Sequence, residues 1–179
     1  MNRAAATGGS ALFFALAPGT VAGLLPWSLT SWRVGMELPW PARLLGTLLI
    51  LAGLLVIVPA FVRFVREGAG TPAPLAQTDR LVVGGPYRFV RNPMYVAVLL
   101  VVAGQAVLLG RWVLVVYGLV AAAAMVGFVK GYEEPHLSRV YGADYEAYRR
   151  AVPGWWPRPR TRRRSRAAAP TRRSPTRSC

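Results

Sequence analysis

The stretch from Leu44 to Val62 constrains this chain more than any other feature. It is built almost wholly from Leu, Ile, Val, Ala and Gly, and it contains no ionisable side chain. A helix of this length covers the hydrocarbon core of a bilayer, which is about 30 Å thick. The stretch therefore predicts a membrane-spanning helix.

Three further apolar stretches, at residues 11–29, 94–109 and 112–129, predict additional spans. A secretory signal peptide is the alternative for the first, but this stretch is long and carries Pro18 and Pro26. Only two residues separate the last two stretches, so they predict an antiparallel hairpin, with a buried helix pair of a soluble protein as the alternative. We predict an all-α integral membrane bundle of about four transmembrane helices.

Charge is segregated along the chain. It has 179 residues, 54% of them hydrophobic, and a formal net charge of +15, with arginine crowded near the C-terminus. If the chain crosses the membrane four times with both termini in the cytoplasm, all but three of its 22 Lys and Arg residues lie inside. The exceptions are Arg33, Arg43 and Arg111. We therefore predict a multi-pass protein with cytoplasmic N- and C-termini.

The C-terminal region predicts two different segments. Residues 136–150 place Tyr141, Tyr145 and Tyr148 on one helical stripe, which predicts an amphipathic interfacial helix with its tyrosines at headgroup depth. Residues 157–179 have no apolar periodicity and predict a disordered, Arg-rich cytoplasmic tail after a membrane-embedded domain at 1–156. Such a tail is expected to contact anionic lipid headgroups. Nothing in it supplies base readout, so no specific nucleic-acid partner is expected.

Cysteine and histidine are too scarce for the common metal sites. The chain has one cysteine, Cys179, and one histidine, His136. A zinc site needs about four ligands, most often from these two residue types. We therefore predict no metal centre.

Two polar clusters flank the predicted hairpin. The first spans residues 84–95, and the second begins with Tyr132-Glu133-Glu134 and continues through the tyrosines that follow. Because a hairpin goes out and returns, both clusters are expected on the same side of the membrane, facing one pocket. Tyrosine rings, guanidinium groups and a carboxylate suit S-adenosylmethionine, which carries an adenine ring, a ribose, a sulfonium and a carboxylate.

Simpler roles remain open for the same residues. Arg91 can extend to headgroup phosphates. Asn92 and Pro93 can start a helix, since Asn is a favoured N-cap and Pro suits the first turn. Adjacent helical residues point about 100° apart, so at most one of Glu133 and Glu134 is expected to enter a pocket squarely.

Residues 79–153 resemble the isoprenylcysteine carboxyl methyltransferase and phospholipid methyltransferase superfamily of integral membrane methyltransferases. The ordered motifs are Leu81-Val82, Gly85-Pro86-Tyr87, Arg91-Asn92-Pro93-Met94-Tyr95, Glu133-Glu134, and Tyr141-Gly142 with Tyr145, Tyr148 and Val152-Pro153. The resemblance implies that S-adenosylmethionine binds within residues 79–153. It also implies a lipophilic, membrane-dissolved substrate that accepts the methyl group on a carboxylate, an amine headgroup or a hydroxyl.

Carried over position by position, the resemblance implies catalytic roles for Arg91 and Glu134. The implied cofactor-binding residues are Asp79, Arg80, Leu81, Val82, Gly85, Tyr87, Asn92, Pro93, Met94, Tyr95 and Glu133. Two positions depart from the family pattern. Asn92 stands where many members have histidine, so this position is expected to bind rather than titrate. Val129 stands where carboxyl-methylating members have arginine, which argues against a prenylcysteine substrate.

Two other functions remain open. Membrane sterol and steroid reductases use NADPH and share a similar helix start and Tyr-Gly-x-x-Tyr ending. These reductases usually carry an acidic residue shortly after the tyrosine of the helix start. The corresponding tyrosine here is Tyr95, and it is followed by Val96, Ala97 and Val98. A non-catalytic membrane protein that recruits partners with its polybasic tail is the other alternative, and it predicts no pocket between the polar clusters.

Overall fold

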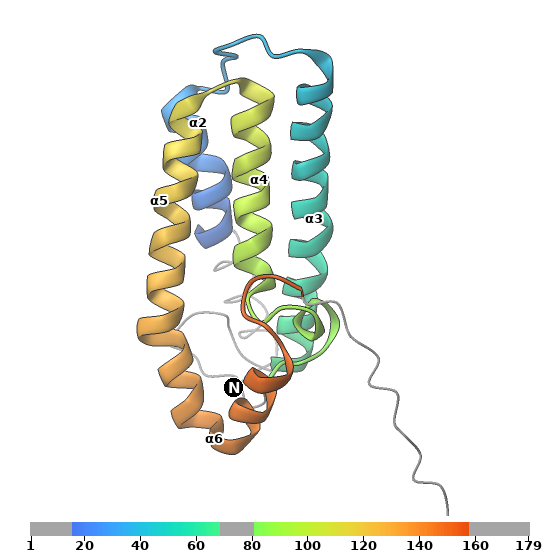
Figure 1. Cartoon of the computed structure of the whole chain (residues 1–179), viewed down its shortest axis with the longest axis vertical. Coiled ribbons are helices and arrows are strands. Elements are labelled where there is room, and N and C mark those ends of the chain that lie inside the picture. The colour runs from blue at the N-terminus through green and yellow to red at the C-terminus, as the bar shows by residue number, and fades with distance from the viewer. Residues whose placement is uncertain (1–15, 69–80, 158–179) are drawn as a thin grey trace, which may run out of the picture.

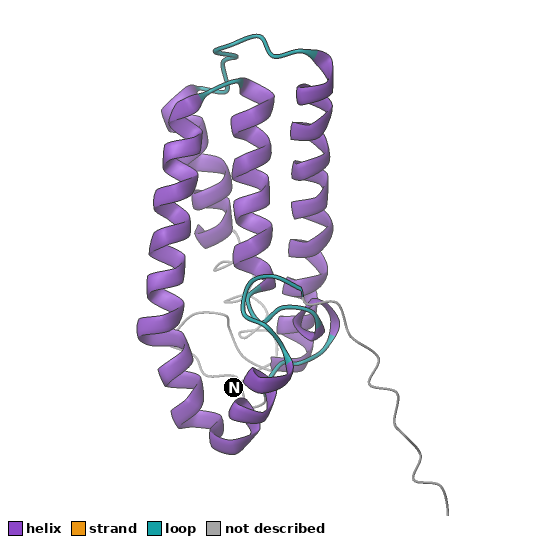
Figure 2. Cartoon of the chain, in the orientation of Figure 1, coloured by secondary structure: helices purple, strands orange, loops and turns teal. Residues whose placement is uncertain are grey.

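The computed structural model describes residues 16–68 and 81–157, and all regular elements in these ranges are helices (Figure 2). The prediction of an all-α fold is confirmed. Residues 16–19 are helical and lead directly into the first π-helical turn. The elements are η1 (Thr20–Leu24), α2 (Leu25–Thr30), α3 (Trp40–Gly68), η2 (Gly85–Arg88), α4 (Pro93–Leu109), α5 (Trp112–Phe128), η3 (Val129–Glu133) and α6 (Glu134–Ala151).

The helices α2, α3, α4 and α5 run side by side along the long axis of the molecule (Figure 1). The contact between α3 and α4 is the most extensive, and glycines make it possible. A Cβ on Gly104 would lie 2.6 Å from the carbonyl oxygen of Gly46, and one on Gly53 would lie 2.7 Å from that of Ala97. Small residues let helix backbones approach closely, which is how helices associate where lipid removes the hydrophobic driving force.

The helices α4 and α5 form the predicted hairpin. Gly110 ends α4 in the left-handed conformation, with φ of 59°, and α5 begins at Trp112. A Cβ on Gly110 would also overlap the carbonyl oxygen of Met36, so this turn requires glycine for space as well as for backbone conformation. The hairpin brings the start of α4 and the end of α5 to the same end of the bundle (Figure 1).

The outer faces of the long helices are apolar and uncovered. Leu55 of α3 is 75% exposed, and Leu119 of α5 is 67% exposed. In the described part of the chain, two helices are long and apolar enough to cross a membrane, at Trp40–Arg63 and within Trp112–Ala151, while α4 is shorter at 17 residues. A soluble protein rarely exposes such continuous apolar surface, whereas lipid tails cover it without cost.

Several predictions fall wholly or partly outside the described residues. The first predicted span begins at residue 11, and only its part from residue 16 onward is described. The cofactor-binding predictions Asp79 and Arg80 lie between the two described ranges, and the predicted tail follows Pro157.

The predicted interfacial helix is part of a longer helical segment. It continues from α5 through η3 and starts at Glu134 rather than residue 136. Gly142, with φ of 50° and ψ of −123°, breaks α6 and turns its second half back toward the start of α4 (Figure 1). This reversal points Tyr145 and Tyr148 inward, onto Arg91 and the carbonyl of Tyr87. The depth of these tyrosines in the membrane stays a prediction.

Candidate functional site

The two polar clusters meet at one end of the bundle, as the hairpin predicted. The backbone N–H of Arg91 donates to the carbonyl oxygen of Pro153 at 2.9 Å, and that of Asn92 donates to Gly154 at 3.1 Å. The Tyr148 hydroxyl donates to the carbonyl oxygen of Tyr87 at 2.7 Å. These bonds join the loop before α4 to the segment after α6, although about 60 residues separate them in the sequence.

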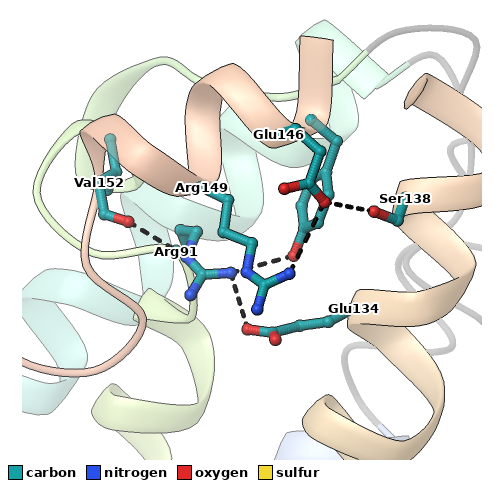
Figure 3. Close-up of polar contacts among 7 residues, drawn as sticks. Arg91, Glu134, Ser138, Glu146, Arg149 and Val152 are labelled. Atoms are coloured by element: carbon teal, nitrogen blue, oxygen red, sulfur yellow. Dashed lines mark hydrogen bonds and ion pairs between the residues drawn. The ribbon is translucent and has the colours of Figure 1, made fainter. Parts of the chain in front are cut away.

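Arg91 is the centre of this junction (Figure 3). Its Nη1 donates to Oε1 of Glu134 at 2.7 Å and to the Tyr145 hydroxyl at 3.1 Å, and its Nε donates to the carbonyl oxygen of Val152 at 3.1 Å. The Arg91 and Glu134 side chains are only 13% and 18% exposed. The guanidinium group therefore links the loop before α4 to the start of α6, to its second half and to the segment that follows it.

A second hydrogen bond joins α4 to η3. The Tyr95 hydroxyl donates to Oε2 of Glu133 at 3.1 Å, and the Tyr95 ring lies against Trp155 with centroids 6.2 Å apart. Glu133 follows the apolar run of α5. Burial raises the pKa of its carboxyl, and the Tyr95 hydrogen bond opposes this shift. Burial beside the same carboxylate also raises the pKa of Tyr87, which keeps that hydroxyl protonated and able to donate.

Two cavities lie against these residues. The larger, of about 170 Å³, faces the bundle interior, and the smaller, of about 80 Å³, lies toward α6. The residues common to both are Tyr87, Arg91, Asn92 and Glu133. These four side chains lie between the two cavities and form a polar partition. Beyond the partition the larger cavity is lined by apolar residues of three different helices, including Val21, Val98 and Met125.

Asn92 carries an unsatisfied donor in this partition. Its side chain is 6% exposed, and its Nδ2 has no hydrogen-bond partner within the described residues. Asn92 and Pro93 start α4 as predicted, at the N-cap and in the first turn, although the Asn92 side chain makes no capping hydrogen bond. A buried amide without a partner costs about 1–3 kcal/mol, and native proteins retain such groups mainly where a ligand or water completes them.

The structure brings most of the predicted site residues together. Pro93, Met94 and Tyr95 line the larger cavity, while Leu81, Val82 and Glu134 line the smaller one. The partition holds the remaining four, and of the acidic pair only Glu133 borders both cavities. Gly85 borders neither. Its φ of 56° and the Arg63 side chain packed against it account for glycine there by backbone conformation and space.

Other residues at the site were missed by sequence reasoning. Ala17 and Pro18, in the helical residues before η1, line the larger cavity, and no polar or periodic signal distinguished them from lipid-facing residues. Tyr145 and Tyr148 were predicted both in the second polar cluster and on the headgroup stripe of the interfacial helix, and the structure places them beside the first cluster. Their spacing from Gly142 could have indicated a reversal, because glycine is the residue that most readily adopts a positive φ.

Val129 is one of the two positions that depart from the family pattern. Its side chain is 1% exposed and lines the smaller cavity, whereas the neighbouring Lys130 is exposed. The position that carries arginine in carboxyl-methylating members therefore offers this cavity a hydrocarbon surface.

Sequence comparison identifies the class of protein to which this site belongs. No similar protein is found among curated sequences. The family model for phospholipid methyltransferases, by contrast, matches residues 41–144, more than half of the chain, from the start of α3 to the first half of α6. The matched region contains α4, the partition and both glutamates. The chain belongs to the phospholipid methyltransferase family, within the superfamily of membrane methyltransferases that includes the isoprenylcysteine carboxyl methyltransferases.

Proposed function

We propose that this protein transfers a methyl group from S-adenosylmethionine to a lipophilic substrate dissolved in the membrane. The observation that carries the proposal is the partition, where a buried carboxylate and an amide nitrogen with no partner among the described residues lie between an apolar cavity and a more polar one. Methyl transfer needs such a boundary, because a charged cofactor and a greasy substrate must meet with their reacting atoms in contact.

The polar groups at the partition fit the cofactor. S-adenosylmethionine carries a sulfonium and ribose hydroxyls that suit Glu133, and acceptor atoms that suit the free donor of Asn92. The rings of Tyr87 and Tyr95 offer flat surfaces next to that carboxylate. We propose these four residues, with Leu81, Val82, Pro93 and Met94, as the described part of the cofactor site.

The chemical step needs positioning more than acid or base strength. When bound, S-adenosylmethionine would supply a methyl group already activated on a cationic sulfur, and the Glu133 carboxylate would take the proton that an amine or hydroxyl acceptor loses. We propose that Arg91 and Glu134 act here as a pair. Their ion pair holds the start of α6, and the Arg91 bonds to Tyr145 and Val152 hold its end over the site, which excludes water and positions the partition residues toward the substrate.

The apolar residues that line the larger cavity favour a lipid-like substrate whose hydrocarbon part lies between the helices. Glu133 at the partition suits an amine or a hydroxyl as the group that accepts the methyl, because both can donate a hydrogen bond to its carboxylate. Val129 supplies no cation for a carboxylate in the smaller cavity, and Arg91 is already bonded to Glu134. We therefore place the amine headgroup and the hydroxyl ahead of the carboxylate as acceptor groups.

The proposed topology places this site at the cytoplasmic face. Four crossings with both termini inside put nearly all basic residues on the cofactor side. In this arrangement residues 1–156 form the membrane domain, and the tail at 157–179 contacts anionic headgroups through its arginines.

Calorimetry on the full chain in phosphatidylcholine nanodiscs tests the cofactor. Removing a buried hydrogen bond to a charged group costs about 1.5–3 kcal/mol, so we expect Glu133→Ala and Tyr95→Ala to weaken S-adenosylmethionine binding about tenfold or more. The matched controls are Glu37→Ala and Tyr132→Ala, because both residues are exposed and neither lines a cavity. Wild-type protein that gives no binding heat at millimolar cofactor would end the proposal.

Lipid mass spectrometry tests the substrate. Lipids from cells with and without the protein should differ by one or more methyl groups in at least one species, and that species should vanish with Glu133→Ala. An unchanged lipid profile alongside normal cofactor binding would refute the membrane-dissolved substrate.

A further inference from the structure

The first helix supplies one wall of the larger cavity. Ala17 and Pro18 lie in the helical residues just before η1, and Val21 lies within η1 itself. The opposite surfaces come from Val98 of α4 and Met125 of α5. The shape of the apolar part of the cavity therefore depends on where the first helix sits against the hairpin.

Pro26 interrupts the hydrogen bonding of this helix. The Leu25 N–H donates to the carbonyl oxygen of Thr20, five residues earlier, in the π-helical pattern. The next N–H along the chain would belong to residue 26, which is a proline and has none. The carbonyls four and five residues before it, those of Ala22 and Val21, therefore cannot receive a backbone donor from this position.

Two side chains of the hairpin satisfy these two carbonyls. The Tyr117 hydroxyl of α5 donates to the Val21 oxygen at 2.7 Å, and Nε2 of Gln105 in α4 donates to the Ala22 oxygen at 2.7 Å. Gln105 lies seven residues after Val98, on the same face of α4. In hydrocarbon an unpaired carbonyl costs several kcal/mol, so these bonds determine which face of the first helix meets the hairpin.

We propose that Gln105 and Tyr117 are positioning residues for the substrate side of the cavity, because they hold the first helix by the two carbonyls to which Pro26 cannot donate. Neither residue lines a cavity, so neither touches substrate or cofactor in this arrangement. Their effect passes through the position of Ala17, Pro18 and Val21. This inference rests on the proposed function for its account of what the cavity binds.

The first experiment separates substrate binding from cofactor binding. Full-length protein in phosphatidylcholine nanodiscs receives tritiated S-adenosylmethionine and increasing mole fractions of a total membrane lipid extract. Phosphatidylcholine itself is an inert diluent because its amine is already fully methylated. An interhelical hydrogen bond in a membrane averages about 0.6 kcal/mol, so we expect Gln105→Leu and Tyr117→Phe each to raise the apparent KM for the extract about threefold.

Three comparisons make this result specific. The calorimetric Kd for S-adenosylmethionine should stay within about twofold of wild type, since the polar partition is untouched. Tyr132→Phe, which removes an exposed hydroxyl, should leave the KM unchanged. In a Pro26→Ala background, residue 26 regains an N–H for one of the two carbonyls, so Gln105→Leu and Tyr117→Phe together should shift the KM less than they do beside Pro26.

The second experiment measures the helix directly. Spin labels at Leu24→Cys and Leu119→Cys, in a Cys179→Ser background, report the distance between the first helix and α5, because both positions are exposed. We expect one narrow distance distribution that broadens or shifts when Gln105→Leu and Tyr117→Phe are combined. An unchanged distribution overturns the positioning role, as does an equal loss of cofactor and substrate affinity. Wild-type protein that binds cofactor but methylates nothing in the extract instead overturns the proposed function and the substrate role derived from it.

Discussion

Arg91 offers the sharpest test of how the site is held together. Arg91→Met removes three hydrogen bonds and leaves Glu134 without its cation. Breaking a buried ion pair costs about 3–5 kcal/mol, and because these two side chains retain some exposure we expect a loss near the lower end, about 3 kcal/mol of unfolding free energy. Arg88→Met is the matched control, since Arg88 is exposed and should lose less than about 0.5 kcal/mol.

The assay is unfolding by sodium dodecyl sulfate in mixed micelles, followed by tryptophan fluorescence. A double variant, Arg91→Met with Glu134→Gln, sharpens the result. Since it also removes the unpaired carboxylate, about 1–2 kcal/mol of the loss should return. Equal losses for Arg91→Met and Arg88→Met would refute the reasoning. A double variant less stable than Arg91→Met alone would show that the carboxylate has another partner.

Three further predictions follow from the same region. Asn92→Ala should lower the unfolding free energy by no more than about 0.5 kcal/mol, because it removes a buried donor that has no partner among the described residues. Calorimetry should show that the same variant binds the cofactor more weakly. A loss of unfolding free energy above about 1 kcal/mol would contradict this reasoning. Gly142→Ala should lower the unfolding free energy by about 1–3 kcal/mol through backbone strain alone, since a Cβ there meets no other atom. Gly131→Ala is equally uncrowded and should leave the unfolding free energy nearly unchanged in the same assay. Burial raises the folded-state pKa of Glu133 above its ordinary value of 4.5, so its contribution to stability is fully present below that value and is lost as pH rises through the folded-state pKa. Unfolding titrations above pH 4.5 should therefore show this decline for wild type and a flatter profile for Glu133→Gln.

The hairpin was predictable because its signals are local. Apolar composition indicates a helix that can lie in lipid, and the Gly110 turn fixes the reversal between α4 and α5. From these two facts it follows that the polar clusters at both ends of the hairpin meet. The continuity of α5 into α6 was not predictable in this way, because the change to an amphipathic pattern suggested a separate helix, whereas the π-helical turn η3 joins the two.

The choice between Glu133 and Glu134 shows a second limit. Adjacent helical residues point in different directions, so the sequence predicted that only one would enter a pocket squarely. Which one depends on the rotation of η3, whose π-helical turn changes the angle between successive residues. Only the fold placed Glu133 at both cavities and Glu134 against Arg91.

By itself, the sequence determined the helical class, the hairpin and the meeting of two polar clusters, since periodicity and apolar length act within a single segment. The tertiary structure alone decided the partner of each polar group. Tyr145 and Tyr148 turn inward only because Gly142 reverses α6, and Gln105 reaches the first helix across 83 residues of chain. Hydrogen bonds of this kind depend on directions set jointly by several helices, and no local pattern in one of them encodes that geometry.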